Sequence, residues 1–273
     1  MPNPVHPPRI VIIVQARMSS SRLPGKVLKP VLGEPLLFRM IERLQQIRHE
    51  AALVVATSID ASDDVIAEAC QANNVLCFRG SLSDCLDRHY QLAKAYEADV
   101  AIKIPSDCPL IDPAVVDEVI DFYLHHSDEY DFVSNLHPAT FPDGNDVEIM
   151  PIAMLEKAWQ EASRPLEREH TTPYFWENPQ QFRLGNVLWS SGLDYSMSHR
   201  FTIDYQEDYE FICRVFEELY PNNPRFGLLD ILNLLEANPA IYEINSKFAG
   251  VNWYRNHLAE LKTVSAEHTK QVL

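Results

Sequence analysis

The sequence predicts an α/β protein with a mostly parallel, mixed central sheet, Rossmann-like in its first half, and a helical C-terminal extension. Three observations predict this fold class. Short apolar runs alternate with helical patterns over the first 125 residues, polar residues follow each apolar run, and helical patterns dominate after residue 205. A βαβα order of this kind is typical of a parallel sheet with helices on both faces.

The first half of the chain contains four expected strands, each a short and mostly apolar run of strand length. They lie at 10–14, 53–56, 75–78 and 100–104. Helices are expected between them. Pro35 precedes a helical spacing of apolar residues, Ser62 and the acids after it suit a helix start, and a third helix is expected at 83–97. A fourth helix begins at Asp112-Pro113, a cap followed by a first-turn proline, and runs to about residue 125.

The second half is less regular. Strands are expected at 131–135, 146–150, 182–187 and 201–204, with longer insertions between them, and helices at 207–219, 228–237 and 251–262. The resulting organisation is a loose leader at 1–8, an α/β domain at 9–205, a helical extension of the same domain at 206–262, and a disordered tail at 263–273.

Composition narrows the classes of function. The net charge of -16 argues against general nucleic-acid binding, which needs a broad basic face. No apolar run reaches membrane-spanning length, so no membrane partner is expected. The five cysteines form no Cys-x-x-Cys pair, and reduced thiols in a cytoplasmic protein are expected.

The most informative segment is the loop 15–26, which follows the first strand directly. It places Arg17, Arg22 and Lys26 among small polar residues. A cationic loop at the end of the first strand of an α/β sheet suits a phosphate-rich ligand, whereas the alternative is a solvated basic turn. The loop is neither a Walker A motif, because Val27 follows Lys26, nor a dinucleotide fingerprint, because Gly25 is its only glycine.

Two carboxylates are candidates for a magnesium site. Asp107 follows the fourth strand and Asp204 ends the strand expected at 201–204. Carboxylates at separate strand ends, together with substrate phosphates, can complete an octahedral Mg²⁺ site. The alternatives are a turn aspartate before Pro109 and a helix cap at Asp204.

Other polar clusters are compatible with acceptor binding. Asp146 and Glu148 alternate on an expected strand, where they can bind sugar hydroxyls or simply face solvent on an edge strand. Glu169 and His170 lie in a cluster of ionisable residues, where His170 is either functional or a satisfied structural histidine. No His-Glu-x-x-His or Gly-x-Ser-x-Gly pattern occurs, so zinc hydrolysis and serine hydrolysis have no support.

These motifs together resemble a known family. The stretch Ala16-Arg17-x-x-Ser20-x-Arg22-Leu23-Pro24-Gly25-Lys26 resembles the signature loop of the cytidylyltransferases that make CMP-linked sugar acids, and is most similar to the spore coat polysaccharide biosynthesis protein F branch. Further similar stretches are Gly80-Ser81-x-x-Asp84-x-Leu86-Asp87-Arg88, Ser106-Asp107-Cys108-Pro109-Leu110-Ile111-Asp112, Asp143-Gly144-x-Asp146-Val147-Glu148, Arg168-Glu169-His170-Thr171 and Thr202-Ile203-Asp204-x-x-x-Asp208. The resemblance covers roughly residues 10–250 and implies the nucleotide-diphospho-sugar transferase fold.

The resemblance implies a role for each matching residue. Nucleotide binding is assigned to Ala16, Arg17, Ser20, Arg22, Gly25, Lys26, Ala56, Thr57 and Ser106, with Arg17, Lys26 and Asp107 as the catalytic residues. Mg²⁺ is assigned to Asp107 and Asp204, and acceptor binding to Asp146, Glu148, Glu169, His170 and Arg200. The chain departs from the pattern at Ser106, where glycine is usual, and at Lys103, where arginine is commoner.

The expected function is Mg²⁺-dependent transfer of CMP from CTP to an acidic sugar, or to a phosphate or phosphonate oxygen, in polysaccharide biosynthesis. A cytoplasmic homodimer is implied by the same resemblance. Two alternatives stay open, a sugar-nucleotide glycosyltransferase and a non-catalytic nucleotide-binding protein. The first normally carries an Asp-x-Asp motif in mid-chain, which is absent, and retention of both aspartates weighs against the second.

Overall fold

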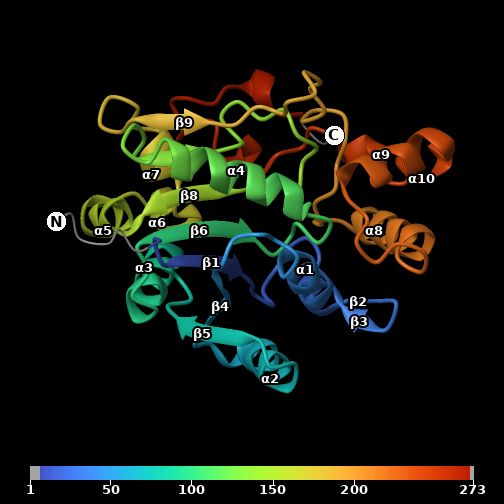
Figure 1. Cartoon of the computed structure of the whole chain (residues 1–273), viewed down its shortest axis with the longest axis horizontal. Coiled ribbons are helices and arrows are strands. Elements are labelled where there is room, and N and C mark those ends of the chain that lie inside the picture. The colour runs from blue at the N-terminus through green and yellow to red at the C-terminus, as the bar shows by residue number, and fades with distance from the viewer. Residues whose placement is uncertain (1–6, 271–273) are drawn as a thin grey trace.

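A seven-stranded sheet runs through the middle of the molecule (Figure 1). The computed structural model describes residues 7–270. The strand order is β5-β4-β1-β6-β8-β7-β9, with β1 Ile10–Gln15, β4 Ala52–Ser58, β5 Leu76–Gly80, β6 Val100–Pro105, β7 Phe132–Ser134, β8 Glu148–Pro151 and β9 Leu184–Asn186. Strand β1 pairs in parallel with β4 and β6, while β8 is antiparallel to both of its neighbours. The expected mostly parallel, mixed sheet is therefore confirmed.

Helices cover both faces of this sheet. They are α1 Leu36–Leu44, α2 Asp64–Ala72, α3 Cys85–Ala95, α4 Pro113–His125, α5 Ile152–Glu161, α6 Pro165–His170, α7 Pro173–Trp176, α8 Gln206–Leu219, α9 Leu228–Ala237 and α10 Pro239–Glu243. A small hairpin, β2 Pro30–Val31 and β3 Glu34–Pro35, precedes α1. Helices α5, α6 and α7 fill the insertions that the sequence left unassigned.

The continuous apolar run of β1 explains why both faces are covered. Ile12 and Val14 belong to a core shared with α1, α2 and α4, whereas Val11 and Ile13 belong to a core shared with α3, α5, α6 and α7. Successive strand residues point to opposite faces, so a run without polar residues needs a helical layer on each side. Burying one such side chain contributes about 1.5–3 kcal/mol.

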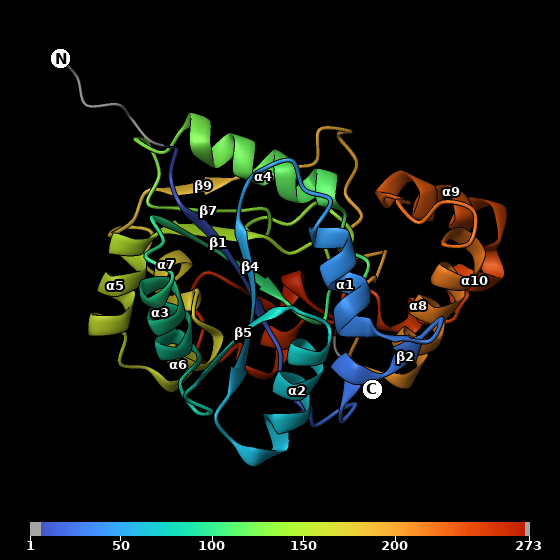
Figure 2. The same cartoon turned by 60° about the horizontal axis from the view of Figure 1, so that its bottom comes forward.

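The helices α8, α9 and α10 form a third core beside α1 (Figure 2). Phe211 and Phe216 of α8 are buried there together with Leu36 of α1 and Phe201. The expected helices at 207–219 and 228–237 are thus confirmed, because their apolar residues meet an apolar surface.

The prediction of a strand at 201–204 is wrong. These residues belong to none of the strands in the described part of the chain. The segment runs past two loops: the Phe201 amide donates to the Asp143 carbonyl and the Ile203 amide donates to the Asp107 carbonyl. Alternating apolar residues are also found in a single extended segment whose amides bond to loops, and this explains the error.

The helix expected at 251–262 is also wrong. Only one short 3₁₀ turn, Trp253–Asn256, forms there. Residues 263–270, expected to be disordered, contain a second 3₁₀ turn at Ala266–His268, and the Lys270 amide donates to the Gly250 carbonyl. The rest of the expected tail, residues 271–273, lies outside the described residues. The same is true of residues 1–6 of the expected leader, whose residues 7 and 8 have no regular structure.

Candidate active site

A cavity of about 970 Å³ opens at the carboxyl ends of β1 and β6. The carboxyl edge of a parallel sheet is where α/β proteins bind ligands. Most of the residues predicted for the site line this cavity: Arg17, Ser20, Arg22, Lys26, Ser106, Asp107, Asp146, Glu148, Glu169, His170, Arg200 and Asp204. Residues more than 180 positions apart in the chain thus share one wall.

Four predicted residues do not line the cavity. Ala56 and Thr57, at the end of β4, are fully buried, and Ala16 is buried beside them because its amide donates to the Ala56 carbonyl. Gly25 has a positive φ of 67°, and a Cβ there would lie 3.2 Å from the Met18 side chain. The structure therefore places these four residues behind the cavity wall, where they shape the loop and the strand ends.

The loop after β1 turns back on itself and brings Lys26 to the strand ends. The Ser20 and Gly25 amides both donate to the Met18 carbonyl, and a 3₁₀ turn begins at Lys26. Lys26 is consequently buried, whereas Arg17 and Arg22 keep part of their side chains exposed at the cavity. Among residues 7–270, the Arg17 guanidinium makes one long hydrogen bond, 3.5 Å to the Leu82 carbonyl.

Lys26 brings the two predicted metal ligands together. Its Nζ lies 3.3 Å from Asp107 Oδ2, 3.0 Å from Asp204 Oδ1 and 2.6 Å from the Ile203 carbonyl oxygen. Burial acts to lower the pKa of Lys26, but Asp107 and Asp204 outweigh it and the pKa is raised. The two carboxylates therefore converge on one cation, although 97 residues separate them in the chain.

Asp204 carries a strongly stabilised negative charge. Arg22 Nη2 lies 2.6 Å from its Oδ1, and Arg200 Nη2 lies 3.1 Å from its Oδ2. Burial acts to raise the pKa of Asp204, but Lys26, Arg22 and Arg200 lower it to about 2. Asp204 is thus ionised at any pH at which the protein would work.

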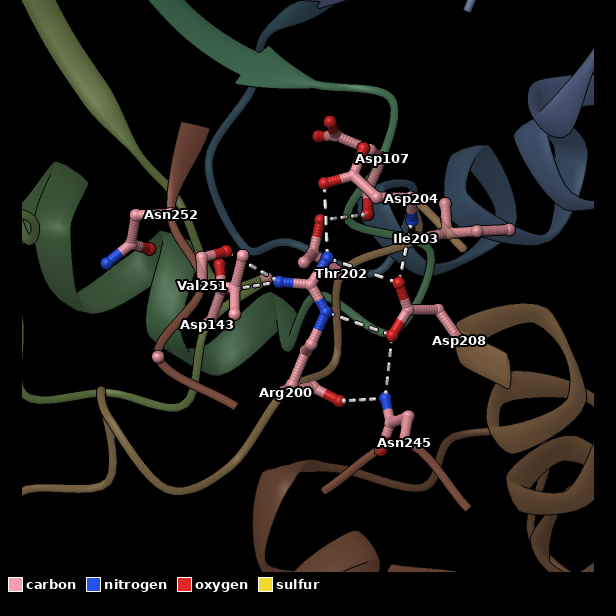
Figure 3. Close-up of polar contacts among 12 residues, drawn as sticks. Asp107, Asp143, Arg200, Thr202, Ile203, Asp204, Asp208, Asn245, Val251 and Asn252 are labelled. Atoms are coloured by element: carbon pink, nitrogen blue, oxygen red, sulfur yellow. Dashed lines mark hydrogen bonds and ion pairs between the residues drawn. The ribbon is translucent and has the colours of Figure 1, made fainter. Parts of the chain in front are cut away.

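Arg200 is the centre of a buried network (Figure 3). Its side chain is 1% exposed, and it pairs with Asp143 at 3.1 Å, Asp204 at 3.1 Å and Asp208 at 2.9 Å. It also donates to the Val251 carbonyl at 3.0 Å. All five N–H groups of the guanidinium are therefore used within the protein, so Arg200 lines the cavity mainly as a support for the carboxylates around it.

The far side of the cavity is acidic. Lys103 of β6 pairs with Glu148 of the antiparallel strand β8, and this attraction raises the pKa of Lys103 against the effect of its burial. Asp146 accepts one hydrogen bond, from the Gly144 amide at 3.3 Å. Burial, together with the charges of Asp107 and Glu148, raises the pKa of Asp146 to about 7.

His170 lies at the same side but is not available as a charged group. Its ring stacks on Trp253 with centroids 4.0 Å apart. Burial and the nearby Lys103 lower the pKa of His170 to about 3. Glu169, its neighbour on α6, is exposed at the rim.

The donor set for a metal consists of two carboxylates. No group of three or more His, Cys, Asp or Glu side chains is arranged to hold a metal ion within residues 7–270. Mg²⁺ is commonly bound by only one or two carboxylates plus substrate phosphates. Asp107 and Asp204 already share a cation, and the Asp107 side chain is 32% exposed to the cavity. These residues therefore fit a divalent ion that is held jointly with a phosphate ligand.

Sequence reasoning missed part of the site. The cavity is also lined by His137, Trp176 and several residues of 252–268. No local motif points to these positions. Only the apolar and aromatic residues of 251–262 form a recognisable pattern, and that pattern predicted a helix.

The fold and the site together define a nucleotidyltransferase of the nucleotide-diphospho-sugar transferase fold. A solved structure titled CMP:2-keto-3-deoxy-manno-octonic acid synthetase complexed with CTP superposes with a TM-score of 0.58 at 18% identity, covering 77% of this chain and 100% of that one. A cytidylyltransferase from Leptospira borgpetersenii superposes with a TM-score of 0.81 at 34% identity, covering 86% of this chain and 96% of that one.

Sequence comparison identifies the family. Residues 11–243 match the family described as cytidylyltransferase. The chain is 30% identical to the spore coat polysaccharide biosynthesis protein SpsF of Bacillus subtilis over 84% of this chain and 95% of that protein. The chain belongs to the cytidylyltransferase family and is a nucleotidyltransferase. Within residues 7–270, no helix is long and apolar enough to cross a membrane.

Proposed function

We propose that this enzyme transfers CMP from CTP to a hydroxyl of an acidic sugar or a similar acceptor, with Mg²⁺ as cofactor and pyrophosphate as the second product. The observation that carries the proposal is the convergence of Asp107, Asp204 and Lys26 beside the arginines of the loop after β1. The structure titled as a complex with CTP and the SpsF relative support CTP and a role in cell-surface polysaccharide synthesis. Action in the cytoplasm as a homodimer is part of the same proposal.

The cationic loop would hold the triphosphate. Arg17 and Arg22 present guanidinium groups at the cavity, and guanidinium forks match phosphate oxygens. Lys26 adds a buried ammonium at the end of β1. These three cations would stabilise the charge that builds up on the departing pyrophosphate. Arg22 and Lys26 are already held in place by their ion pairs with Asp204.

Asp107 and Asp204 would hold the Mg²⁺. When bound, the metal would polarise the α-phosphate and lower the pKa of the acceptor hydroxyl. The protein's own contribution is to keep Asp204 ionised and both carboxylates oriented. Arg200 does this for Asp204, and a hydrogen bond from the Thr202 hydroxyl to the Asp107 carbonyl joins the two segments that carry the acids.

The acceptor would enter from the side that carries Asp146 and Glu148, with Glu169 and His170 at its edge. Its hydroxyl would attack the α-phosphorus, the bond from the α-phosphorus to the bridging oxygen would break, and pyrophosphate would leave. Catalysis would thus rest on positioning and on charge neutralisation.

The test measures pyrophosphate release with Mg²⁺, each of the four nucleoside triphosphates and a panel of acidic sugars. Release should be fastest with CTP. The variant Asp107→Asn should lower turnover at least about a hundred-fold, since losing one comparable electrostatic contact costs about 3–4 kcal/mol of barrier. The matched control is Asp121→Asn, which changes an aspartate that pairs with Arg48 outside the cavity.

Two results would contradict the proposal. One is near-normal turnover of Asp107→Asn, which would remove the metal role of this residue. The other is sugar transfer from a nucleotide sugar without pyrophosphate release, which is the reaction of a glycosyltransferase.

A further inference from the structure

The C-terminal segment 251–270 forms one wall of the cavity, although it lies beyond the residues that match the family. In Figures 1 and 2 this dark red segment folds back over the sheet domain and does not continue the helices α8, α9 and α10. The residues that it contributes to the lining are Val251, Asn252, Trp253, Tyr254, Asn256, His257, Thr263, Val264, Glu267 and His268. A segment with little regular structure thus supplies a large part of the cavity wall.

Specific contacts hold this segment in place. Val251 accepts a hydrogen bond from Arg200, at one end of the segment. The buried Glu177 carboxylate accepts hydrogen bonds from the Lys262 amide at 2.7 Å and the Thr263 amide at 2.8 Å. Leu261 is buried in the core that contains α3 and α5. The residues between these contacts are therefore fixed over the cavity.

Two stacked ring pairs border the cavity at this end. His170 and Trp253 have centroids 4.0 Å apart with an interplanar angle of 18°, and His137 and Trp176 have centroids 4.6 Å apart at 30°. All four residues line the cavity. Burial lowers the pKa of His137 to about 4, so both imidazoles are uncharged at neutral pH and offer hydrogen bonds without charge.

The charges at this end do not favour a second anionic group. Arg17 reaches this end, where it helps to lower the pKa of His170, and it is the cation next to which the acceptor carboxylate would lie. The other cations among the described residues lining this end, Lys103 and Arg200, are both paired with carboxylates. Glu169 and Glu267 add negative charge. The Asn256 amide, the side-chain oxygen of Asn252 and the neutral imidazoles suit hydroxyl groups. The half-buried Trp253 ring suits the apolar face of a sugar ring.

We propose that this end of the cavity binds the ring of the acceptor, a hydroxyl-rich pyranose, with Trp253 as the residue that sets acceptor specificity. The inference rests on the proposed function and extends it. In a 2-keto sugar acid the carboxylate and the anomeric hydroxyl share one carbon, so the carboxylate would stay with the nucleophile near Arg17, and the remaining ring would reach Trp253. Recognition of the acceptor therefore depends on a part of the chain outside the matched region.

The test measures acceptor binding by calorimetry in the presence of CMP, so that no turnover occurs. The probes are 3-deoxy-manno-octulosonate, N-acetylneuraminate, glucuronate and methyl glucoside, with pyruvate as an acid that has no ring. At least one pyranose should bind the wild type, and Trp253→Ala should weaken this binding at least tenfold, whereas Trp253→Phe should restore most of it. Pyruvate and CTP should bind the wild type and Trp253→Ala equally.

A second variant tests whether acceptor binding also depends on how the segment 251–270 is held in place. Glu177→Gln should also weaken pyranose binding, because it disturbs the attachment of the segment while Glu177 itself does not line the cavity. The matched control is Trp159→Ala, which removes a tryptophan that stacks on Tyr90 and does not line the cavity.

The outcomes are distinguishable. Equal pyranose binding by the wild type and Trp253→Ala overturns the inference, and so does loss of CTP binding in Trp253→Ala, since the ring would then have only a structural role. If the wild type binds CTP but none of the pyranoses, the inference fails while the nucleotide half of the proposed function stands. If CTP does not bind either, the proposed function itself fails.

Discussion

Replacing Arg200 by methionine should be one of the most damaging single changes in the molecule. The substitution keeps the apolar part of the side chain and removes a guanidinium that faces Asp143, Asp204 and Asp208. Breaking a buried ion pair from one side costs about 3–5 kcal/mol, because a charge is left buried without its partner. A domain is stabilised by only about 5–15 kcal/mol in total.

The contacts of the three carboxylates narrow the expected loss of stability in Arg200→Met. Asp204 would keep Lys26 and Arg22, so its charge stays compensated. Asp208 is fully buried and would keep two backbone amides and the Asn245 side chain. Asp143 would lose its only ion-pair partner among the described residues. We therefore expect a loss near the middle of the range, about 4 kcal/mol.

The assay is urea unfolding followed by circular dichroism at pH 7. Arg214→Met is the matched control, because Arg214 is half exposed on α8 and pairs only with exposed glutamates, and it should change stability by less than about 0.5 kcal/mol. Arg200→Lys keeps the charge but not the planar fork, so its loss of stability should lie between those of Arg200→Met and Arg214→Met. A loss below about 1.5 kcal/mol in Arg200→Met would refute the reasoning, because it would mean that the three carboxylates do not depend on this residue.

Two further predictions concern pH and metal. The lowered pKa of Asp204, about 2 against an ordinary 3.8, makes its ionised form stabilising above about pH 4, and this stabilisation is lost as the pH falls through 2. The free energy of unfolding of Asp204→Asn should thus lie about 2 kcal/mol below the wild type at pH 7, with the gap closing below pH 4; a gap that is constant down to pH 2.5 would contradict this origin. Chelation by EDTA should abolish pyrophosphate release and added Mg²⁺ should restore it, whereas release that continues in EDTA would remove the metal from the proposal.

The parallel half of the sheet could be predicted because its signals are local. The run that became β1 is apolar from Ile10 to Val14, and that of β6 is interrupted only by Lys103. The residues that follow each strand must lie at the same edge of the sheet. The convergence of the loop after β1 with Asp107 follows from this rule alone. Asp204 also joined them, although the strand that was expected to carry it does not form.

The rest depended on contacts between distant segments. Val251, Tyr254 and Leu261 have a spacing compatible with a helix, but hydrogen bonds to Glu177 and burial of Leu261 hold the segment in another shape. The role of Arg200 as a hub could not be seen, because its partners lie up to 57 residues away. Tertiary contacts of this kind override local preference.

The order in which the chain is made gives the Arg200 network one more consequence. During synthesis, the strands of the sheet and the loop after β1 emerge first, while Asp208, Asn245 and the segment that begins at Val251 emerge last. A nascent chain released before these residues emerge would contain a nearly complete sheet yet leave Arg200 without Asp208 and the Val251 carbonyl. The network around Arg200 would therefore be complete only after Val251 has emerged, well after the strands of the sheet.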